Sequence, residues 1–267
     1  MIASIGNDEN GRYLSQFMHD CGVIPLYQKS KTGNPTGTTA ALVTDDGTRT
    51  LVANIAASAD LNESALSFIE TQEALRISGI IFVEGYILTN CSSVAFKLAQ
   101  FASNSKKVFS FGISATFVVQ ERFSDILKLL PLCDILFGNL DEALELAKHL
   151  MGQELNSSSP SEAVKNIIAK SFKNTEISLI EGICQLVIIT NGSGPVTVGM
   201  HLKDGSVDIL EFEVDPAKVT GDAIGAGDTF AAGVLMALLS NLSVEESIAM
   251  GNKYSAQCLK HTGCFID

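Results

Sequence analysis

The sequence is short of positive charge. Its 267 residues include 18 Lys and Arg against 30 Asp and Glu, which gives a formal net charge of −12. Nucleic acid and anionic membrane surfaces repel such a chain, so we expect neither as a partner. A local basic pocket for a small anion stays compatible with this balance.

Long apolar runs and paired cysteines are also missing. No run reaches the roughly 20 apolar residues that a membrane-spanning helix needs. The six cysteines are scattered, without a Cys-x-x-Cys pair or a cluster with the four histidines, which argues against a zinc site and a disulfide framework. The opening residues, MIASIGNDENGR, lack the basic start and apolar stretch of a signal peptide. We therefore expect a reduced, soluble protein in the cytoplasm, with a nuclear pool as an alternative.

Apolar residues are plentiful, at 46% of the chain, which is enough for a large core. Short, wholly apolar runs at 79–83, 107–111, 134–137 and 185–190 alternate with helical segments. Strands that are apolar on both faces and separated by helices are typical of a parallel sheet covered on both sides. The sequence therefore predicts one α/β domain over residues 1–267, with a doubly wound, mostly parallel sheet and helices on both faces.

Other segments flank this predicted core. Residues 38–44 and 50–55 are β-type runs around the turn DDG at 45–47, which predicts a hairpin. Together with the turn-rich stretch before them, they form a small β-rich lid within about 24–56. A second hairpin is predicted over 196–214, and helices at about 227–240 and 244–260 follow it. An amphipathic helix precedes the lid, and its apolar positions are Leu14, Phe17, Met18 and Cys21.

Polar residues follow two of the apolar runs. Ligands of open α/β sheets bind at the carboxyl ends of the strands, so these residues are candidates for a site. Asn139 and Glu142 come after the run at 134–137, at the opening of a helix. They form either a capping box or a polar pair that orders a hydrated Mg²⁺ near a phosphate. Thr190, followed by the turn at Gly192, belongs either to an ordinary strand connection or to a close backbone approach to a nucleotide.

The most informative stretch is GDAIGAGDTF, residues 221–230. Its small residues let the backbone come close to a ligand. The helix that follows presents unpaired N–H groups and the positive end of its dipole to an anion. Asp228, in the first turn, is either an acid favoured by the helix dipole or a general base for a hydroxyl. The stretch is not a Walker A loop, because it has no Gly-Lys-Ser/Thr.

These stretches resemble a known family. DAIGAGDTFAAGVL resembles the Asp-Thr-x-Gly-Ala-Gly-Asp signature of the ribokinase (phosphofructokinase-B) family of sugar and nucleoside kinases, and GNLDEA resembles its Asn-x-x-Glu motif. Within the family, NPTGTTAALVTDDGTRTLVANIAASA, CDILFGNLDEA and HTGC resemble members that phosphorylate adenosine. The resemblance is collinear from about Ile5 to Cys264. It implies a monomer that serves purine salvage by transferring phosphate from ATP, with Mg²⁺, to the 5′-hydroxyl of adenosine.

The resemblance also assigns roles to residues by their position. Asp228 matches the general base, and the N–H groups of Gly225, Ala226 and Gly227 match the anion hole for the transferring phosphoryl group. Asn139 and Glu142 match the pair that orders Mg²⁺ through water. Arg49 matches an arginine that points at the phosphates. The residues that match the ATP site are Thr190, Gly192, Asp222 and, more weakly, Asn252. The residues that match the apolar wall around the adenine of the substrate are Leu51, Ala53 and Phe117, although core packing also explains Leu51 and Phe117.

The sequence departs from the family pattern at three places. Ala223 stands where the signature has Thr, and Ile224 fills its variable position; we expect both to tune affinity. The resemblance further implies an N-terminal segment that carries the first strands and the Asp that grips the ribose hydroxyls. We expect these N-terminal strands to be missing, which exposes a sheet edge. Two alternatives stay open: another ribokinase-type kinase for a sugar or nucleoside, and a catalytically defective relic that binds nucleotide.

Overall fold

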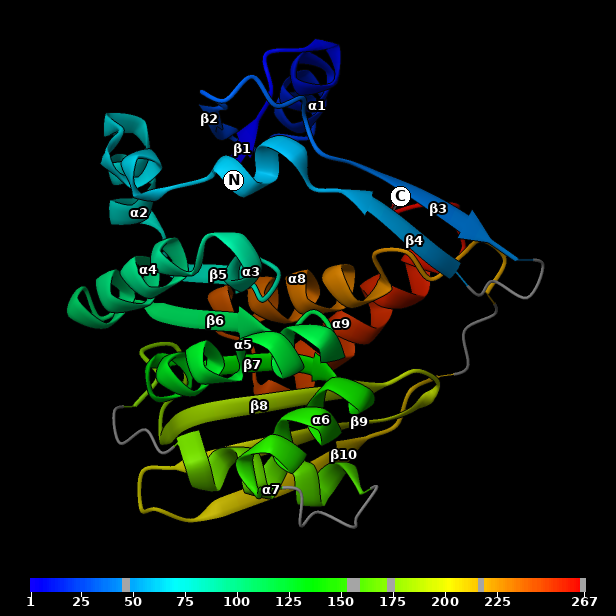
Figure 1. Cartoon of the computed structure of the whole chain (residues 1–267). Coiled ribbons are helices and arrows are strands. Elements are labelled where there is room, and N and C mark those ends of the chain that lie inside the picture. The colour runs from blue at the N-terminus through cyan, green and yellow to red at the C-terminus, as the bar shows by residue number, and fades with distance from the viewer. Residues whose placement is uncertain (45–48, 153–158, 172–175, 216–218, 265–267) are drawn as a thin grey trace.

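The computed structural model describes residues 1–44, 49–152, 159–171, 176–215 and 219–264 (Figure 1). Its main sheet has the strand order β10-β9-β8-β7-β6-β5. Strands β5 to β8 pair in parallel, whereas β9 is antiparallel to both β8 and β10. The strands are β5 (Ile80–Glu84), β6 (Val108–Gly112), β7 (Ile135–Asn139), β8 (Ile183–Asn191), β9 (Gly194–Leu202) and β10 (Val207–Phe212).

Helices cover both faces of this sheet (Figure 1). On one face, α4 to α7 pack against the apolar cluster that contains Phe109, Phe111 and Leu136. On the other face, α8 and α9 pack against the cluster that contains Ile135 and Phe137. Successive strand residues point to opposite faces, so a strand covered on both sides must be apolar throughout. The helices are α2 (Ile69–Ile77), α3 (Ile87–Asn90), α4 (Ser92–Asn104), α5 (Thr116–Leu129), α6 (Leu140–Leu150), α7 (Pro160–Ser171), α8 (Ala226–Leu239) and α9 (Val244–Cys258), with a 3₁₀ turn, η3 (Leu130–Leu132), after α5.

The first part of the chain lies outside the main sheet (Figure 1). Strands β1 and β2 form a parallel pair, and β3 and β4 form an antiparallel hairpin whose described side chains are exposed. The segment between β2 and β3 is tied at both ends: the Thr36 hydroxyl donates to Asp8, and the Ser30 and Thr32 hydroxyls donate to Asp60. The elements are β1 (Ile2–Ile5), α1 (Glu9–Asp20), β2 (Leu26–Lys29), β3 (Thr38–Val43), β4 (Arg49–Asn54), η1 (Ala56–Asp60) and η2 (Glu63–Ser67).

The fold class predicted from the sequence is confirmed: the sheet is mostly parallel, helices cover both faces, and both hairpins form. The pairing of β1 with β2 was not predicted. The turn at 45–47 lies outside the described residues. The single domain and the role of residues 24–56 as a lid stay predictions. Within the described ranges, no helix is long and apolar enough to cross a membrane.

Candidate active site

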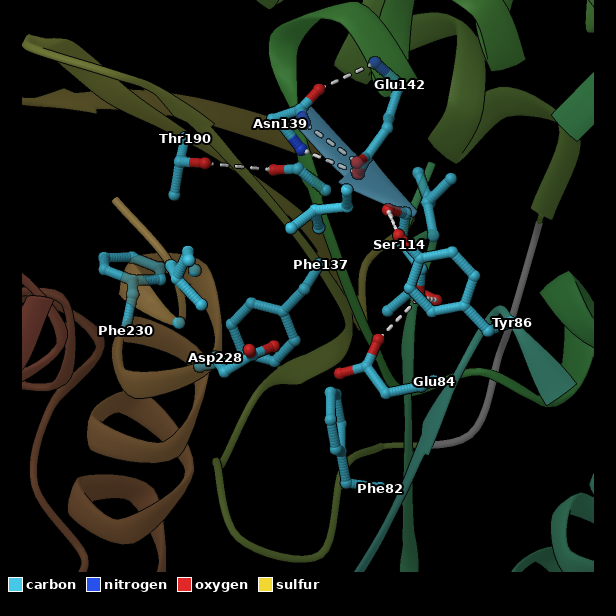
Figure 2. Close-up of a pocket in the computed structure, with 18 residues that line it drawn as sticks. Phe82, Glu84, Tyr86, Ser114, Phe137, Asn139, Glu142, Thr190, Asp228 and Phe230 are labelled. Atoms are coloured by element: carbon cyan, nitrogen blue, oxygen red, sulfur yellow. Dashed lines mark hydrogen bonds between the residues drawn. The ribbon is translucent and has the colours of Figure 1, made fainter. Parts of the chain in front are cut away.

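A cavity of about 330 Å³ opens at the carboxyl ends of the parallel strands, beside the start of α8 (Figure 2). Each of four neighbouring strands contributes a residue at or next to its carboxyl end to the lining: Glu84 from β5, Gly112 from β6, Asn139 from β7 and Thr190 from β8. The first turn of α8 closes one side through Gly225, Gly227 and Asp228. The topology thus brings together residues far apart in the chain, such as Glu84 and Asp228, which are 144 positions apart.

The loop before α8 is held in a conformation that requires glycine. Gly225 has φ of +79°, in the left-handed region, and a Cβ there would overlap the side chain of Cys264. Asp222, which is 1% exposed, anchors the loop: its carboxylate accepts the N–H of Ile224 at 2.7 Å and that of Gly263 at 3.0 Å. Two of the stretches that carried the family resemblance, 221–230 and 261–264, therefore meet at this anchor.

Asp228 lies in the first turn of α8 and lines the cavity (Figure 2). Its side chain is exposed, whereas the helix below it is buried between the sheet and α9. In the described part of the chain, the N–H groups of Gly225 and Gly227 meet no backbone acceptor, and that of Ala226 makes only a long bond of 3.4 Å to the Ala223 carbonyl. A carboxylate thus stands beside free N–H donors at the positive end of a helix dipole.

Asn139 and Glu142 both cap a helix and line the cavity, so the two interpretations of this pair, a capping box and a pair that orders hydrated Mg²⁺, are compatible. Asn139 accepts the Glu142 N–H at 2.9 Å, and Glu142 accepts the Asn139 N–H at 3.0 Å, a capping box at the start of α6. Glu142 is only 7% exposed. Burial raises the pKa of its carboxyl, the bond from Asn139 lowers it, and the nearby charges of Glu84 and Asp141 raise it further.

Glu84 is a cavity residue that the sequence interpretation missed. It ends β5, and its carboxylate accepts the Ser114 hydroxyl at 2.5 Å. Burial raises the pKa of this carboxyl, the Ser114 bond lowers it, and the charge of Asp228 raises it. The available signal was a carboxylate directly after an apolar parallel strand, where such sheets bind ligands. Tyr86 also lines the cavity and was also missed.

The cavity carries negative charge without a described positive partner. Three carboxylates, Glu84, Glu142 and Asp228, line it, and within the described ranges no Lys, Arg or His side chain does. Nor do three or more His, Cys, Asp or Glu side chains gather anywhere in those ranges to hold a metal directly. Mg²⁺ keeps several waters and binds through one or two carboxylates together with substrate phosphates, so this donor set fits a hydrated Mg²⁺.

The other predicted residues divide into those that reach the cavity and those that do not. Leu51, Thr190 and Ile224 line it. Gly192 lies in the β8–β9 turn with φ of +56° and is not part of the lining. Asn252 lines a separate cavity of about 550 Å³ between β10 and α9.

Ala53 and Phe117 are exposed and also lie outside the lining. The ring of Phe117 packs against that of Tyr86, with 6.0 Å between the ring centroids. Arg49 begins β4, and its side chain lies outside the described residues. Asp222 anchors the loop rather than lining the cavity.

The whole chain, residues 1–267, matches the family described as pfkB family carbohydrate kinase. The chain belongs to the pfkB family. Adenosine kinase 2 of Arabidopsis thaliana is 28% identical over 265 residues, which are 98% of this chain and 72% of that protein. Adenosine kinase of Dictyostelium discoideum is 25% identical over 266 residues, or 98% of this chain and 73% of that protein.

Solved structures of adenosine kinases have a similar fold. The Anopheles gambiae adenosine kinase, solved with P1,P4-di(adenosine-5) tetraphosphate, superposes with a TM-score of 0.86 at 30% identity, covering 98% of this chain and 74% of that one. The Schistosoma mansoni adenosine kinase with 2-fluoroadenosine has a TM-score of 0.87 at 23% identity, covering 100% of this chain and 74% of that one. A likeness at this identity shows the fold alone. The chain is therefore a kinase of the pfkB family, with its cavity at the strand ends where α/β folds bind ligands.

Proposed function

We propose that this chain transfers the γ-phosphoryl group of ATP to the 5′-hydroxyl of adenosine, giving AMP and ADP. The observation that carries the proposal is Asp228, which lies beside the free N–H groups of the Gly225–Gly227 loop and faces a cavity large enough for a small acceptor. The relatives named adenosine kinase support adenosine as that acceptor.

Asp228 acts as the general base in this proposal. The 5′-oxygen attacks the γ-phosphorus, the bond from that phosphorus to the bridging oxygen of ADP breaks, and the hydroxyl proton passes to the Asp228 carboxylate. A positioned base contributes about 10²- to 10⁴-fold to such a rate. The free N–H groups at the start of α8 lie where charge develops on the transferred phosphoryl group, and one such donor is worth about 10²- to 10³-fold.

Asn139 and Glu142 hold the metal side of the site. When bound with ATP, Mg²⁺ supplies positive charge that neutralises the phosphate oxygens. The buried Glu142 carboxylate and the Asn139 amide are hard oxygen donors, and the capping box fixes both against the end of β7. Their own task is to order the waters around the metal rather than to bind it from several sides.

The hairpin β3–β4 acts as a lid over the acceptor. Leu51 of β4 lines the cavity although its side chain is 50% exposed, so the hairpin reaches the site while most of its own surface faces solvent. Movement of the hairpin towards the cavity would bury this surface and exclude water, which prevents the hydrolysis of ATP.

A coupled assay of purified protein with ATP, Mg²⁺ and a panel of acceptors tests the proposal. We expect adenosine to be phosphorylated with the highest kcat/KM among adenosine, inosine, ribose and fructose. The family description, carbohydrate kinase, favours a sugar acceptor as the second candidate, and a preference for ribose or fructose would select it. Calorimetric binding of ATP without turnover of any acceptor would instead indicate a nucleotide-binding relic.

A further inference from the structure

Glu84 lines the cavity and is held there by hydrogen bonds, although the proposed function gives this residue no role. It is the last residue of β5, and its Oε2 accepts the Ser114 hydroxyl at 2.5 Å. The backbone N–H of the next residue, Gly85, donates to the same Ser114 oxygen at 2.8 Å. Ser114 therefore locks both the Glu84 carboxylate and the backbone that follows it.

Ser114 adopts an unusual conformation to do so. Its φ is +74°, in the left-handed region, where residues other than glycine are uncommon. The Tyr86 hydroxyl donates to the Ser114 carbonyl at 3.0 Å and so holds the same residue through its backbone. Backbone strain of this kind persists only where the surroundings determine it, and it gathers at functional sites.

One carboxylate oxygen of Glu84 stays available to a ligand. Ser114 occupies Oε2, and in the described part of the chain Oε1 meets no hydrogen-bond donor. Figure 2 shows this oxygen pointing into the cavity towards the side from which Asp228 enters. Gly112, on the neighbouring strand, leaves room for the carboxylate, since a Cβ there would lie only 3.0 Å from Oε2.

A purely structural role does not account for this placement. Glu84 is partly buried near the like charges of Asp228 and Glu142, and no described cation lines the cavity to balance it. Such a carboxylate is costly unless it gains a partner when a ligand binds. The ligand must supply a donor, and it must approach Asp228 with another group at the same time.

We propose that Glu84 binds a secondary ribose hydroxyl of the acceptor through Oε1, and so holds the acceptor with its reacting hydroxyl towards Asp228. This inference rests on the proposed function, because it assumes a nucleoside acceptor with hydroxyls beyond the one that reacts. Glu84 then selects ribonucleosides over deoxyribonucleosides, since a buried acceptor that loses its donor is left unpaired.

A cycle of enzyme and substrate changes tests this inference. The wild type and Glu84→Ala are each assayed with adenosine, 2′-deoxyadenosine and 3′-deoxyadenosine. We expect the wild type to lose about 10- to 100-fold in kcat/KM on at least one deoxy substrate, the range for a hydrogen bond to a charged group. Glu84→Ala loses a similar factor with adenosine and no longer distinguishes that deoxy substrate from adenosine within about twofold.

Three further variants separate binding from folding. Glu84→Gln keeps an accepting oxygen and should retain part of the discrimination, whereas Ser114→Ala removes the hydroxyl that fixes Glu84 and should weaken it. Glu73→Ala makes the same change as Glu84→Ala on an exposed face of α2 and should match the wild type. Thermal unfolding of all variants identifies any that are not folded. If Glu84→Ala does not fold, the comparison of Glu84→Gln with the wild type tests the inference instead.

The outcomes distinguish this inference from the proposed function. If the wild type phosphorylates adenosine but Glu84→Ala and Glu84→Gln keep its full discrimination, or the wild type shows none, the inference is wrong and the proposed function stands. The same holds if Glu84→Ala raises only the Mg²⁺ concentration needed for activity. If the wild type does not phosphorylate adenosine at all, the proposed function fails and the inference fails with it.

Discussion

Replacing Gly225 with alanine should damage both the stability and the activity of the protein. The residue has φ of +79°, and an added Cβ would overlap the side chain of Cys264. The left-handed conformation costs a residue with a Cβ about 1–2 kcal/mol, and forcing an atom into a packed site costs about 1–3 kcal/mol. Together these terms lower the free energy of unfolding by about 2–5 kcal/mol.

Gly227→Ala is the matched control for stability. Gly227 lies two positions further on, inside the first turn of α8, and a Cβ there meets nothing within 4 Å. Alanine in a helix is favoured over glycine by up to about 1 kcal/mol, so this variant should be as stable as the wild type or more stable. Urea unfolding of both variants, with the same slope against denaturant, measures the difference.

Gly225→Ala should also slow turnover, because relief of the overlap with Cys264 moves the loop and its N–H groups away from the phosphoryl position. Loss of one such donor reduces kcat by about 10²- to 10³-fold. A Gly225→Ala variant that unfolds within about 0.5 kcal/mol of the wild type, the usual range for neutral surface substitutions, would refute the reasoning about this loop.

Two further predictions concern pH. Burial raises the pKa of Glu142 above 4.5, so the folded protein holds this proton more tightly than the unfolded chain and loses stability as the pH rises past that value. Glu142→Gln should therefore be more stable than the wild type at pH 7 by urea unfolding, yet less active, and a stability gain equally large at pH 4 would contradict this. Hydrogen bonds from Thr36 lower the pKa of Asp8 from 3.8 to about 2, so its stabilising effect is complete above pH 4 and disappears as the pH falls towards 2. The stability of Asp8→Asn should depend less on pH between 4 and 2 than that of the wild type. An acid unfolding transition identical to that of the wild type would show that Asp8 does not contribute to this pH dependence.

The main sheet could be predicted because its strands are apolar on both faces. Each of the runs at 79–83, 107–111, 134–137 and 185–190 overlaps a strand of the structure, displaced by one or two residues. Wholly apolar runs of this length are typical of buried strands and too short for a buried helix, and the intervening helices leave parallel pairing as the simplest arrangement. The pair β1–β2 was missed because each strand has only four residues and mixed polarity.

The site could be predicted only where a local motif marked it. Asn139 and Glu142 stand three residues apart at a helix start, and Gly225 to Asp228 form one continuous stretch, so spacing alone drew attention to them. Glu84 has no such spacing, because its partner Ser114 lies 30 residues away. Only the packing of β5 beside β6 brings the two together, and no local pattern predicts that contact.

The central claim is that Asp228 removes the proton from the 5′-hydroxyl of adenosine. Steady-state phosphorylation of adenosine by the wild type and by Asp228→Asn, with ATP binding and thermal unfolding measured in parallel, tests it most directly. We expect AMP formation by the wild type and a loss of at least about 10²-fold in kcat for Asp228→Asn, with ATP binding and folding close to those of the wild type. Turnover of Asp228→Asn within tenfold of the wild type would contradict it.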